Sequence, residues 1–310
     1  MGNYLPQINE IIAGEVNRLD NALIYGENLD RGSYLSGLSK NLTTSDTRRI
    51  VNVGNCEYTH CGVGFGAMLG GANAVLFVKQ LDFMLLGIDH FVSTYHFIRS
   101  RPIENLGSFT IVAAVYDQGY QGPQSSFNAL SDICSMGRFS GFTLTNLADA
   151  KKVAAQEISK PGFRIIGLSQ RCAGDEIYDP NWVEYSADLS TFQYVKGDDL
   201  TIVCANFSLP FGRKAQEELS AKGISSSLFS VNSTDKSDWS LLLRDAKKTG
   251  KVLILDDSKG LNALGHRISQ AIAESDSEIK THSVFRPAGI EFGVSEEQFI
   301  VSLRRYYQLS

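Results

Sequence analysis

One stretch of the chain, residues 55–89, combines a carboxylate with an unusual run of small residues. Glu57 is followed by Gly62, Gly64 and Gly66 in a segment with the general pattern of a helix. Because glycine costs about 1 kcal/mol in a helix relative to alanine, this run indicates close approach by another subunit, another helix or a ligand. Glu57 is therefore a candidate for chemistry, although a first-turn acid of a tightly packed helix has the same pattern.

The same stretch contains Cys56, His60 and Cys61, which could suggest a metal site. Structural zinc sites pair their cysteines as Cys-x-x-Cys, and no such pair or second cluster follows here. We predict no metal ligands in this chain and interpret the thiols as small residues that line a packed helix. His60 lies one helical turn after Glu57, so it either faces the same cleft in a catalytic role or is a structural histidine.

The surrounding segments predict how these side chains are positioned. We expect helices at 8–23 and 85–97, and strands at 22–25, 74–78, 109–115, 142–144 and 163–168, with a further helix beginning near Asn146. Strands that alternate with helices favour a parallel sheet covered on both faces. Ligands of such sheets bind beyond the carboxyl ends of the strands, where Glu27 and a polar loop at 117–126 are expected.

A second alternating region follows residue 197. It predicts strands and helices in the order strand 200–205, helix 211–222, strand 226–231, helix 238–248, strand 251–255 and helix 262–274. Residues 171–197 have weaker apolar periodicity and are interpreted as a linker. We therefore predict an α/β protein with two domains, 1–170 and 198–310, each a mainly parallel sheet flanked by helices on both faces.

Composition limits the classes of function. The length of 310 residues and the hydrophobic content of 43% are sufficient for two globular cores. A net charge of −5 gives no indication of nucleic acid or an anionic membrane as a partner. No apolar run approaches the roughly 20 residues that span a bilayer, and no signal-peptide pattern is seen. Five scattered cysteines are typical of a reducing compartment, so we expect a cytoplasmic protein.

The order of several short motifs resembles one family. Gly26-Glu27, Gly37-Leu38 and Arg49-Ile50-Val51 precede Glu57, and Leu81-Asp82-Phe83 follows it. This series is similar to the beta subunits of pyruvate and branched-chain 2-oxo acid dehydrogenases, in the transketolase-like group of thiamine diphosphate enzymes. Gly62 and Gly66 stand at the family's offsets of five and nine residues from the acid. Segments at 196–203, 215–225 and 247–255 resemble the carboxyl-terminal domain of that family.

The resemblance implies roles for individual residues. The first domain would be a pyrimidine-binding domain, in which Glu57 hydrogen-bonds the pyrimidine ring of thiamine diphosphate and promotes formation of its reactive form. Phe83 matches the aromatic that packs against that ring, or is simple core. Glu27 matches an acid that helps to link active sites in relatives, or belongs to a solvated loop or helix cap.

The resemblance also implies a partner. The family binds the diphosphate and magnesium through Gly-Asp-Gly and a later asparagine, and this sequence contains no Gly-Asp-Gly. A separate alpha-type subunit would then bring diphosphate and magnesium, in an α2β2 assembly with the glycine run at the interface. This chain would bring the pyrimidine site.

Two departures from the family pattern keep the reaction open. Residues 117–127 lack the histidine that the family carries there, and at 232–238 only Asp238 remains of the motif Arg-Thr-x-x-Pro-x-Asp. The first hypothesis is a heteromeric enzyme that forms an acyl or ketol carbanion from a 2-oxo acid or ketose and passes it to an acceptor. The second is a conventional 2-oxo acid dehydrogenase beta subunit that transfers acyl groups to lipoyl. The third is a non-catalytic scaffold or regulatory subunit.

Overall fold

The computed structural model describes residues 2–117, 128–234, 238–258 and 263–285. These residues divide into two compact units. The first contains 2–117 and 133–179, and the second contains 128–132 and the described residues from 180 onward. Each unit contains one six-stranded sheet, and no helix of the described residues is long and apolar enough to cross a membrane.

The sheet of the first unit is parallel throughout. Its strands are ordered β2-β1-β3-β4-β6-β5, and the register places Ile24 beside Val75 and Leu76 beside Ile111. The central strands β4 and β6 are buried along almost their whole length, as expected for a sheet covered on both faces. The strands are β1 (Ala22–Gly26), β2 (Arg48–Asn52), β3 (Asn73–Val78), β4 (Ser108–Val115), β5 (Ser140–Leu144) and β6 (Gly162–Ser169).

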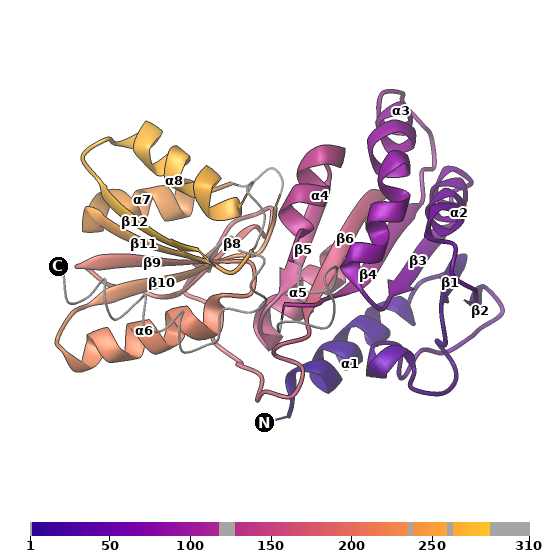
Figure 1. The fold of residues 1–310 in the computed structure, drawn as a ribbon, viewed down its shortest axis with the longest axis horizontal. Helices are drawn as coiled ribbons and strands as arrows, with labels where there is room; N and C mark the ends of the chain where they lie inside the picture. Colours follow the sequence, from indigo (N-terminus) through magenta and orange to yellow (C-terminus); the bar gives the residue numbers. More distant parts are fainter. Residues whose placement is uncertain (1, 118–127, 235–237, 259–262, 286–310) are drawn as a thin grey trace. The chain divides into compact units, whose positions relative to one another are not determined.

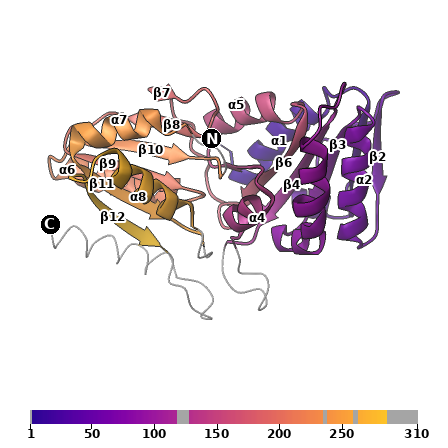
Figure 2. The ribbon, with the colours of Figure 1, turned by 90° about the horizontal axis from the view of Figure 1, so that it is seen from above.

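Helices cover both faces of this sheet, with α1 (Tyr4–Val16) and α5 (Leu147–Glu157) on one face and α2 (Glu57–Leu69) and α3 (Tyr95–Arg99) on the other (Figures 1 and 2). Asn146 begins α5 as predicted, because its side chain accepts from the Asp149 N–H at 3.0 Å. The unit also contains short helical segments at η1 (Leu35–Gly37), η2 (Leu81–Gly87) and η3 (His90–Thr94), and α4 (Leu130–Gly137) precedes β5.

Residues 85–97 are helical, as predicted, but they do not form one regular α-helix. The chain instead forms η2, a 3₁₀ segment, then η3, a π-helical turn, and then α3. Tight packing against α2 accounts for the irregularity, because a Cβ at Gly87 would lie 2.4 Å from the Cys61 Sγ. The side chain of His90 likewise fills the space beside Gly62, at 3.2 Å from a Cβ built there. The fit to α2 outweighs the helical propensity of the segment.

The second unit has a mainly parallel sheet ordered β12-β11-β9-β10-β8-β7, in which β8 runs antiparallel to both of its neighbours, β10 and β7. Apolar side chains of β9, β10 and β11 form one core with α7 and α8. The elements are β7 (Glu184–Tyr185), β8 (Thr191–Val195), β9 (Leu200–Ala205), α6 (Leu209–Ala221), β10 (Ser226–Val231), α7 (Ser240–Thr249), β11 (Lys251–Asp256), α8 (Leu264–Ser275) and β12 (Lys280–Phe285).

Residues 171–197 are therefore not a simple linker, because 184–195 contribute β7 and β8 to the second sheet. Four of the five residues of β8 are buried. The strand was missed because the loop-forming residues before it, such as Gly174 and Pro180, dominate the local pattern. The α/β class with two mainly parallel, helix-flanked sheets is confirmed.

We expect Gly64→Ala to lower the stability of the isolated chain by about 1–3 kcal/mol, because overpacking a full core forces side chains out of place. A Cβ at Gly64 would lie 2.3 Å from the ring of buried Phe109. The matched change Gly66→Ala meets nothing within 4 Å and should raise stability by up to about 1 kcal/mol through helix propensity. Urea unfolding monitored by circular dichroism measures both, and equal effects would contradict this account.

Candidate functional site

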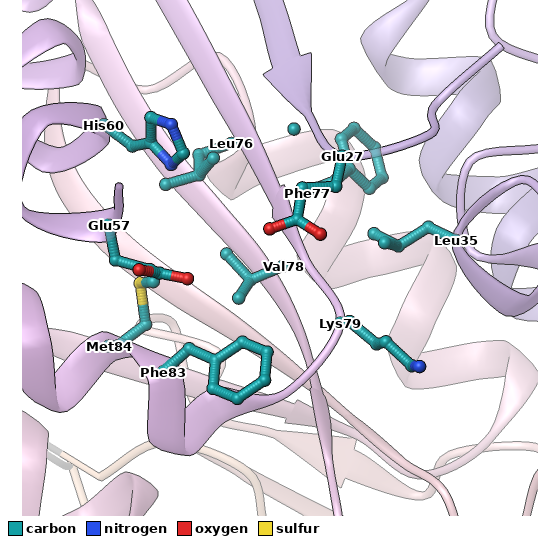
Figure 3. Close-up of a pocket in the computed structure, with 11 residues that line it drawn as sticks. Glu27, Leu35, Glu57, His60, Leu76, Phe77, Val78, Lys79, Phe83 and Met84 are labelled. Carbon is teal, nitrogen blue, oxygen red and sulfur yellow. The ribbon is translucent and has the colours of Figure 1, made fainter. Parts of the chain in front are cut away.

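A pocket lies where the strand order of the first sheet reverses. The strands β2 and β3 pair on opposite sides of β1, so the chain crosses over β1 between them. In open α/β sheets, ligands bind outside the carboxyl ends of the strands at such a switch point. The pocket encloses about 20 Å³, and Figure 3 shows the residues that line it: Gly26, Glu27, Leu35, Glu57, His60, Leu76, Phe77, Val78, Lys79, Phe83 and Met84.

Glu57 enters this pocket from the first turn of α2, where it is 9% exposed. Negative charge at the amino end of a helix is stabilised by the unpaired N–H groups there. Figure 3 shows the Glu57 and Glu27 carboxylates pointing into the same space from different elements. The structure therefore brings together the two acids that the sequence analysis selected.

Glu27 is positioned by its neighbours at the end of β1. Gly26 must be glycine, because a Cβ there would lie 2.5 Å from the Phe77 backbone oxygen. With its amide nitrogen toward the acid, Asn55 donates to Glu27 Oε1 at 2.7 Å. Glu27 is half-buried and lines the pocket, so its environment is not that of a freely solvated loop.

His60 lies in the same pocket, one turn along α2 from Glu57. Burial lowers the pKa of the imidazole, and this effect is opposed by the negative charges of Glu57 and Glu27 and by a hydrogen bond to the backbone of Gly54. The Tyr25 hydroxyl donates to the His60 backbone oxygen at 2.7 Å, which ties α2 to β1. The two carboxylates therefore act on the His60 imidazole through their charge.

We expect the His60 imidazole to titrate below its ordinary pKa of 6.5 in the folded chain. Glu57→Gln should lower this pKa further, because it removes a negative charge that favours the imidazolium. The exposed control Glu10→Gln on α1 should leave the His60 pKa unchanged. NMR titration of the His60 ring protons measures this pKa in the wild-type chain and in the two variants. A higher His60 pKa in Glu57→Gln would contradict the geometry.

Phe83 is half-buried and lines the pocket from η2. Its partial exposure favours a wall of the pocket over the simple core that was the alternative interpretation. The sequence analysis did not assign six of the lining side chains to a site, namely Leu35, Leu76, Phe77, Val78, Lys79 and Met84. Lys79 could have been found, because it directly follows the predicted strand 74–78 at the carboxyl end of the sheet.

The other predicted features lie partly outside the described residues. Within the polar loop at 117–127, the structure describes only Asp117. The carboxylate of Asp117 accepts hydrogen bonds from the Ser169 hydroxyl at 2.6 Å and from the Arg171 backbone N–H at 2.9 Å. The motif at 232–238 is described at 232–234 and at Asp238. Both departures from the family pattern therefore remain observations on the sequence.

The cysteines differ in reactivity rather than forming a cluster. Cys56 is exposed, and its pKa is lowered by hydrogen bonds from Thr59. Burial raises the pKa of the Cys61 thiol to about 12, which leaves it unreactive. Across the described ranges, no group of three or more histidine, cysteine, aspartate or glutamate side chains is arranged to hold a metal.

One side of α2 carries large apolar side chains that are about half exposed, although the Tyr58 ring packs against His90 with their centroids 4.3 Å apart. Tyr58, Val63 and Leu69 are 51%, 44% and 44% exposed. Gly66 is also exposed, and no atom lies within 4 Å of a Cβ built there. By contrast, Gly62 and Gly64 pack closely inside the chain, because a Cβ at these positions would contact the rings of His90 and Phe109. We call Tyr58, Val63, Gly66 and Leu69 the α2 outer face.

Comparison with known proteins identifies relatives over most of the chain. Residues 193–299 match the family model of the transketolase C-terminal domain. The 2-oxoisovalerate dehydrogenase subunit beta of Bacillus subtilis is 21% identical over 302 residues, covering 88% of this chain and 84% of that protein. The pyruvate dehydrogenase E1 component subunit beta of Rhizobium meliloti is 20% identical, covering 86% of this chain and 59% of that protein. The chain resembles the beta subunits of 2-oxo acid dehydrogenases.

Solved structures extend this resemblance to transketolase-like proteins. A split-gene transketolase, described as an inactive beta4 tetramer, superposes with a TM-score of 0.72 at 16% identity and covers 100% of this chain and 99% of that one. The transketolase of Campylobacter jejuni gives a TM-score of 0.71 at 12% identity, covering 98% of this chain and 46% of that one. At these identities the structural likeness establishes the fold.

Proposed function

We propose that this chain is the beta-type subunit of a heteromeric thiamine diphosphate enzyme. The enzyme takes an acyl or ketol group from a 2-oxo acid or a ketose and transfers it to an acceptor. The observation that carries the proposal is Glu57, a largely buried carboxylate that opens α2 and lines the switch-point pocket. The resemblance to dehydrogenase beta subunits and transketolases supports the same assignment.

The residues present fit the pyrimidine half of the cofactor. An aminopyrimidine needs a carboxyl group for its ring nitrogen and an apolar wall for its face, and the pocket offers Glu57 and Phe83. Thiamine diphosphate, when bound, supplies the electron sink for cleavage of the bond next to the substrate carbonyl. Glu57 would hold a proton at the ring nitrogen, and Phe83 would orient the ring. Because Glu57 is largely buried from water, the hydrogen bond between its carboxyl and the ring would be stronger than in solvent.

The diphosphate half does not fit this chain. The sequence has no Gly-Asp-Gly, and the described residues offer no cluster of acids for magnesium. We therefore infer that a second, alpha-type chain completes the site, holds diphosphate and magnesium, and assembles with this one as α2β2.

The α2 outer face supports a partner at this position. An exposed glycine in a helix costs stability, and a Cβ built at Gly66 would meet no atom within 4 Å among the described residues. A second backbone that approaches α2 closely would account for Gly66 and would cover Tyr58, Val63 and Leu69. Because Glu57 opens the same helix, a chain bound there also reaches the pocket.

A conventional 2-oxo acid dehydrogenase beta subunit is the second candidate. The names of the curated relatives favour it, since they are beta subunits of 2-oxoisovalerate and pyruvate dehydrogenases. The absence of a histidine from 117–127 does not separate the two candidates, because the family uses one in both acyl and ketol transfer. Transfer of an acyl group to a lipoyl domain by the purified complex would decide for the dehydrogenase.

The proposal is tested by purifying the tagged chain from its native cells and sequencing the proteins that bind it. We expect a partner with Gly-Asp-Gly followed after about 25–30 residues by asparagine, as family resemblance implies. Calorimetry should then detect magnesium-dependent thiamine diphosphate binding by the complex and none by this chain alone. Absence of such a partner, together with no cofactor binding, would leave the scaffold hypothesis in its place.

A further inference from the structure

A second pocket lies at the opposite end of the first sheet from the candidate site. It has a volume of about 470 Å³ and is formed where β1, β2 and β3 begin. The parallel register pairs Ala22 with Arg48 and with Asn73, which brings the three strand starts together. Gly26, at the other end of β1, lines the candidate site. The length of β1, roughly 13 Å, therefore separates the two pockets.

Hydrogen bonds between the turns that precede the three strands fix the rim of this pocket. The Ala22 N–H donates to the Thr47 backbone oxygen at 2.9 Å, and the Asn73 N–H donates to the Asn21 backbone oxygen at 2.9 Å. The Thr47 hydroxyl donates to the Asp20 carboxylate at 3.1 Å. Asn21 has a left-handed backbone with a φ of 47°, which asparagine tolerates better than most residues. The pocket is therefore preformed, as small-molecule sites usually are.

Two opposite charges line the pocket without neutralising each other. Asp46 and Arg49 both contribute to its wall, and both are exposed, so a ligand reaches them from solvent. Within the described ranges, neither side chain forms an ion pair or a hydrogen bond. The neighbouring Arg48 differs, because it is buried and donates to three backbone oxygens. Arg48 thus serves the fold, whereas the Arg49 guanidinium is available for a ligand.

Three other lining side chains are apolar, namely Ala22, Leu23 and Ala72. Leu23 and Ala72 are half-buried, so they keep part of their surface open to the pocket. The short side chains of the two alanines leave room for an apolar group of a ligand. Small-molecule sites typically combine such apolar walls with a few charged groups that fix the orientation of the ligand.

We propose that this pocket binds a free α-amino acid with an apolar side chain. The Arg49 guanidinium would bind the carboxylate through two parallel hydrogen bonds. Asp46 would bind the ammonium group, and the apolar side chain of the ligand would lie against Leu23. The inference goes beyond the proposed function and does not depend on it, because the pocket lies outside the candidate site.

The charges of the pocket select a zwitterion among possible ligands. A phosphate or a simple carboxylate would gain Arg49 but would meet the like charge of Asp46. An amine would gain Asp46 but would meet the like charge of Arg49. A specific site rejects wrong ligands through such repulsion as well as through attraction. An amino acid with an apolar side chain satisfies both charges and also covers the apolar wall.

The test is isothermal titration calorimetry of the purified full chain with three probes that differ in charge. L-Leucine carries both charged groups, 4-methylpentanoate lacks the ammonium group, and 3-methylbutylamine lacks the carboxylate. We expect L-leucine to bind at one site per chain. Each of the other two probes should bind about tenfold more weakly or worse, because it leaves one charge of the pocket unpaired.

The variants Arg49→Gln and Asp46→Asn should each weaken L-leucine binding by about tenfold or more. Arg49→Lys keeps the charge but loses the paired hydrogen bonds, so it should bind with intermediate affinity. The matched controls are Arg244→Gln on α7 and Asp89→Asn, which change exposed residues elsewhere and should bind as the wild type does. The substituted residues of the pocket are exposed, so melting midpoints should stay near the wild-type value.

A further variant, Glu57→Gln, locates the bound probe. It alters the candidate site and not the second pocket, so it should bind L-leucine with wild-type affinity. Loss of binding in this variant would place the probe in the candidate site and overturn the inference.

The remaining outcomes are equally decisive. Absence of L-leucine binding, equal binding of the three probes, or unchanged binding by Arg49→Gln or by Asp46→Asn would each overturn the inference. None of these results bears on the proposed function, because the measurement contains neither a partner subunit nor thiamine diphosphate.

Discussion

Glu57→Gln is expected to reduce turnover by the assembled complex by about a hundredfold to ten-thousandfold, the range typical of a lost general acid or base. Glutamine has nearly the same size and still forms a hydrogen bond, but it cannot hold the proton that the proposed function places between the carboxyl and the cofactor ring. Because Glu57 opens α2 and lines the pocket, the loss should be in kcat. The measurement is the steady-state rate with saturating cofactor.

The control for this variant is assembly. The substitution adds no volume, so the complex should keep the same mass by size-exclusion chromatography with light scattering. Glu10→Gln, at an exposed position of α1, should retain full activity. A Glu57→Gln complex that keeps most of its rate would remove the catalytic assignment and favour the scaffold hypothesis.

Gly66→Leu is expected to weaken binding of the alpha-type partner by about tenfold to a hundredfold. This change in affinity corresponds to the cost of about 1–3 kcal/mol that is typical when a closely packed contact is overfilled. No atom of the described chain lies within 4 Å of a Cβ at this position, so the isolated chain should remain folded. A partner backbone packed against α2 would instead meet the new side chain. Surface plasmon resonance between the two purified subunits measures the affinity.

The matched control is Gly14→Leu on α1, where a Cβ also meets nothing within 4 Å. Both variants replace an exposed helical glycine by leucine, so they should affect helix stability alike. Only Gly66→Leu should reduce partner binding. Normal affinity of the Gly66→Leu chain would show that the partner does not contact the α2 outer face.

The glycine run illustrates how far sequence reasoning extends. Three glycines in one helix predicted close approach to another helix, a subunit or a ligand, without deciding among them. The structure assigns Gly64 to the ring of Phe109 and Gly62 to His90, so both serve packing inside the chain. For Gly66, the described residues provide no such contact. Residues 45 positions apart, such as Gly64 and Phe109, meet through the fold, and no local pattern reveals that.

Asp82 is a second case of this limit. In the sequence it stood within an apolar stretch next to Phe83, as part of a family motif. Its burial without a hydrogen-bond partner depends on how η2 packs at the ends of β3 and β4. The irregular helical turns from 81 to 99 were not predicted either, since they arise from packing on α2 and not from propensity.

By itself, the sequence determined the α/β class, most buried strands, and the series of motifs around Glu57, because periodicity and short-range order are local properties of the chain. It also selected Glu27, Glu57, His60 and Phe83, which the structure brings to one pocket. Only the tertiary structure decided that this pocket lies at the switch point beside β1, that Lys79 lines it, and that β7 and β8 belong to the second sheet. These features depend on strand order and long-range packing, which are set by the burial of surfaces that are distant in sequence.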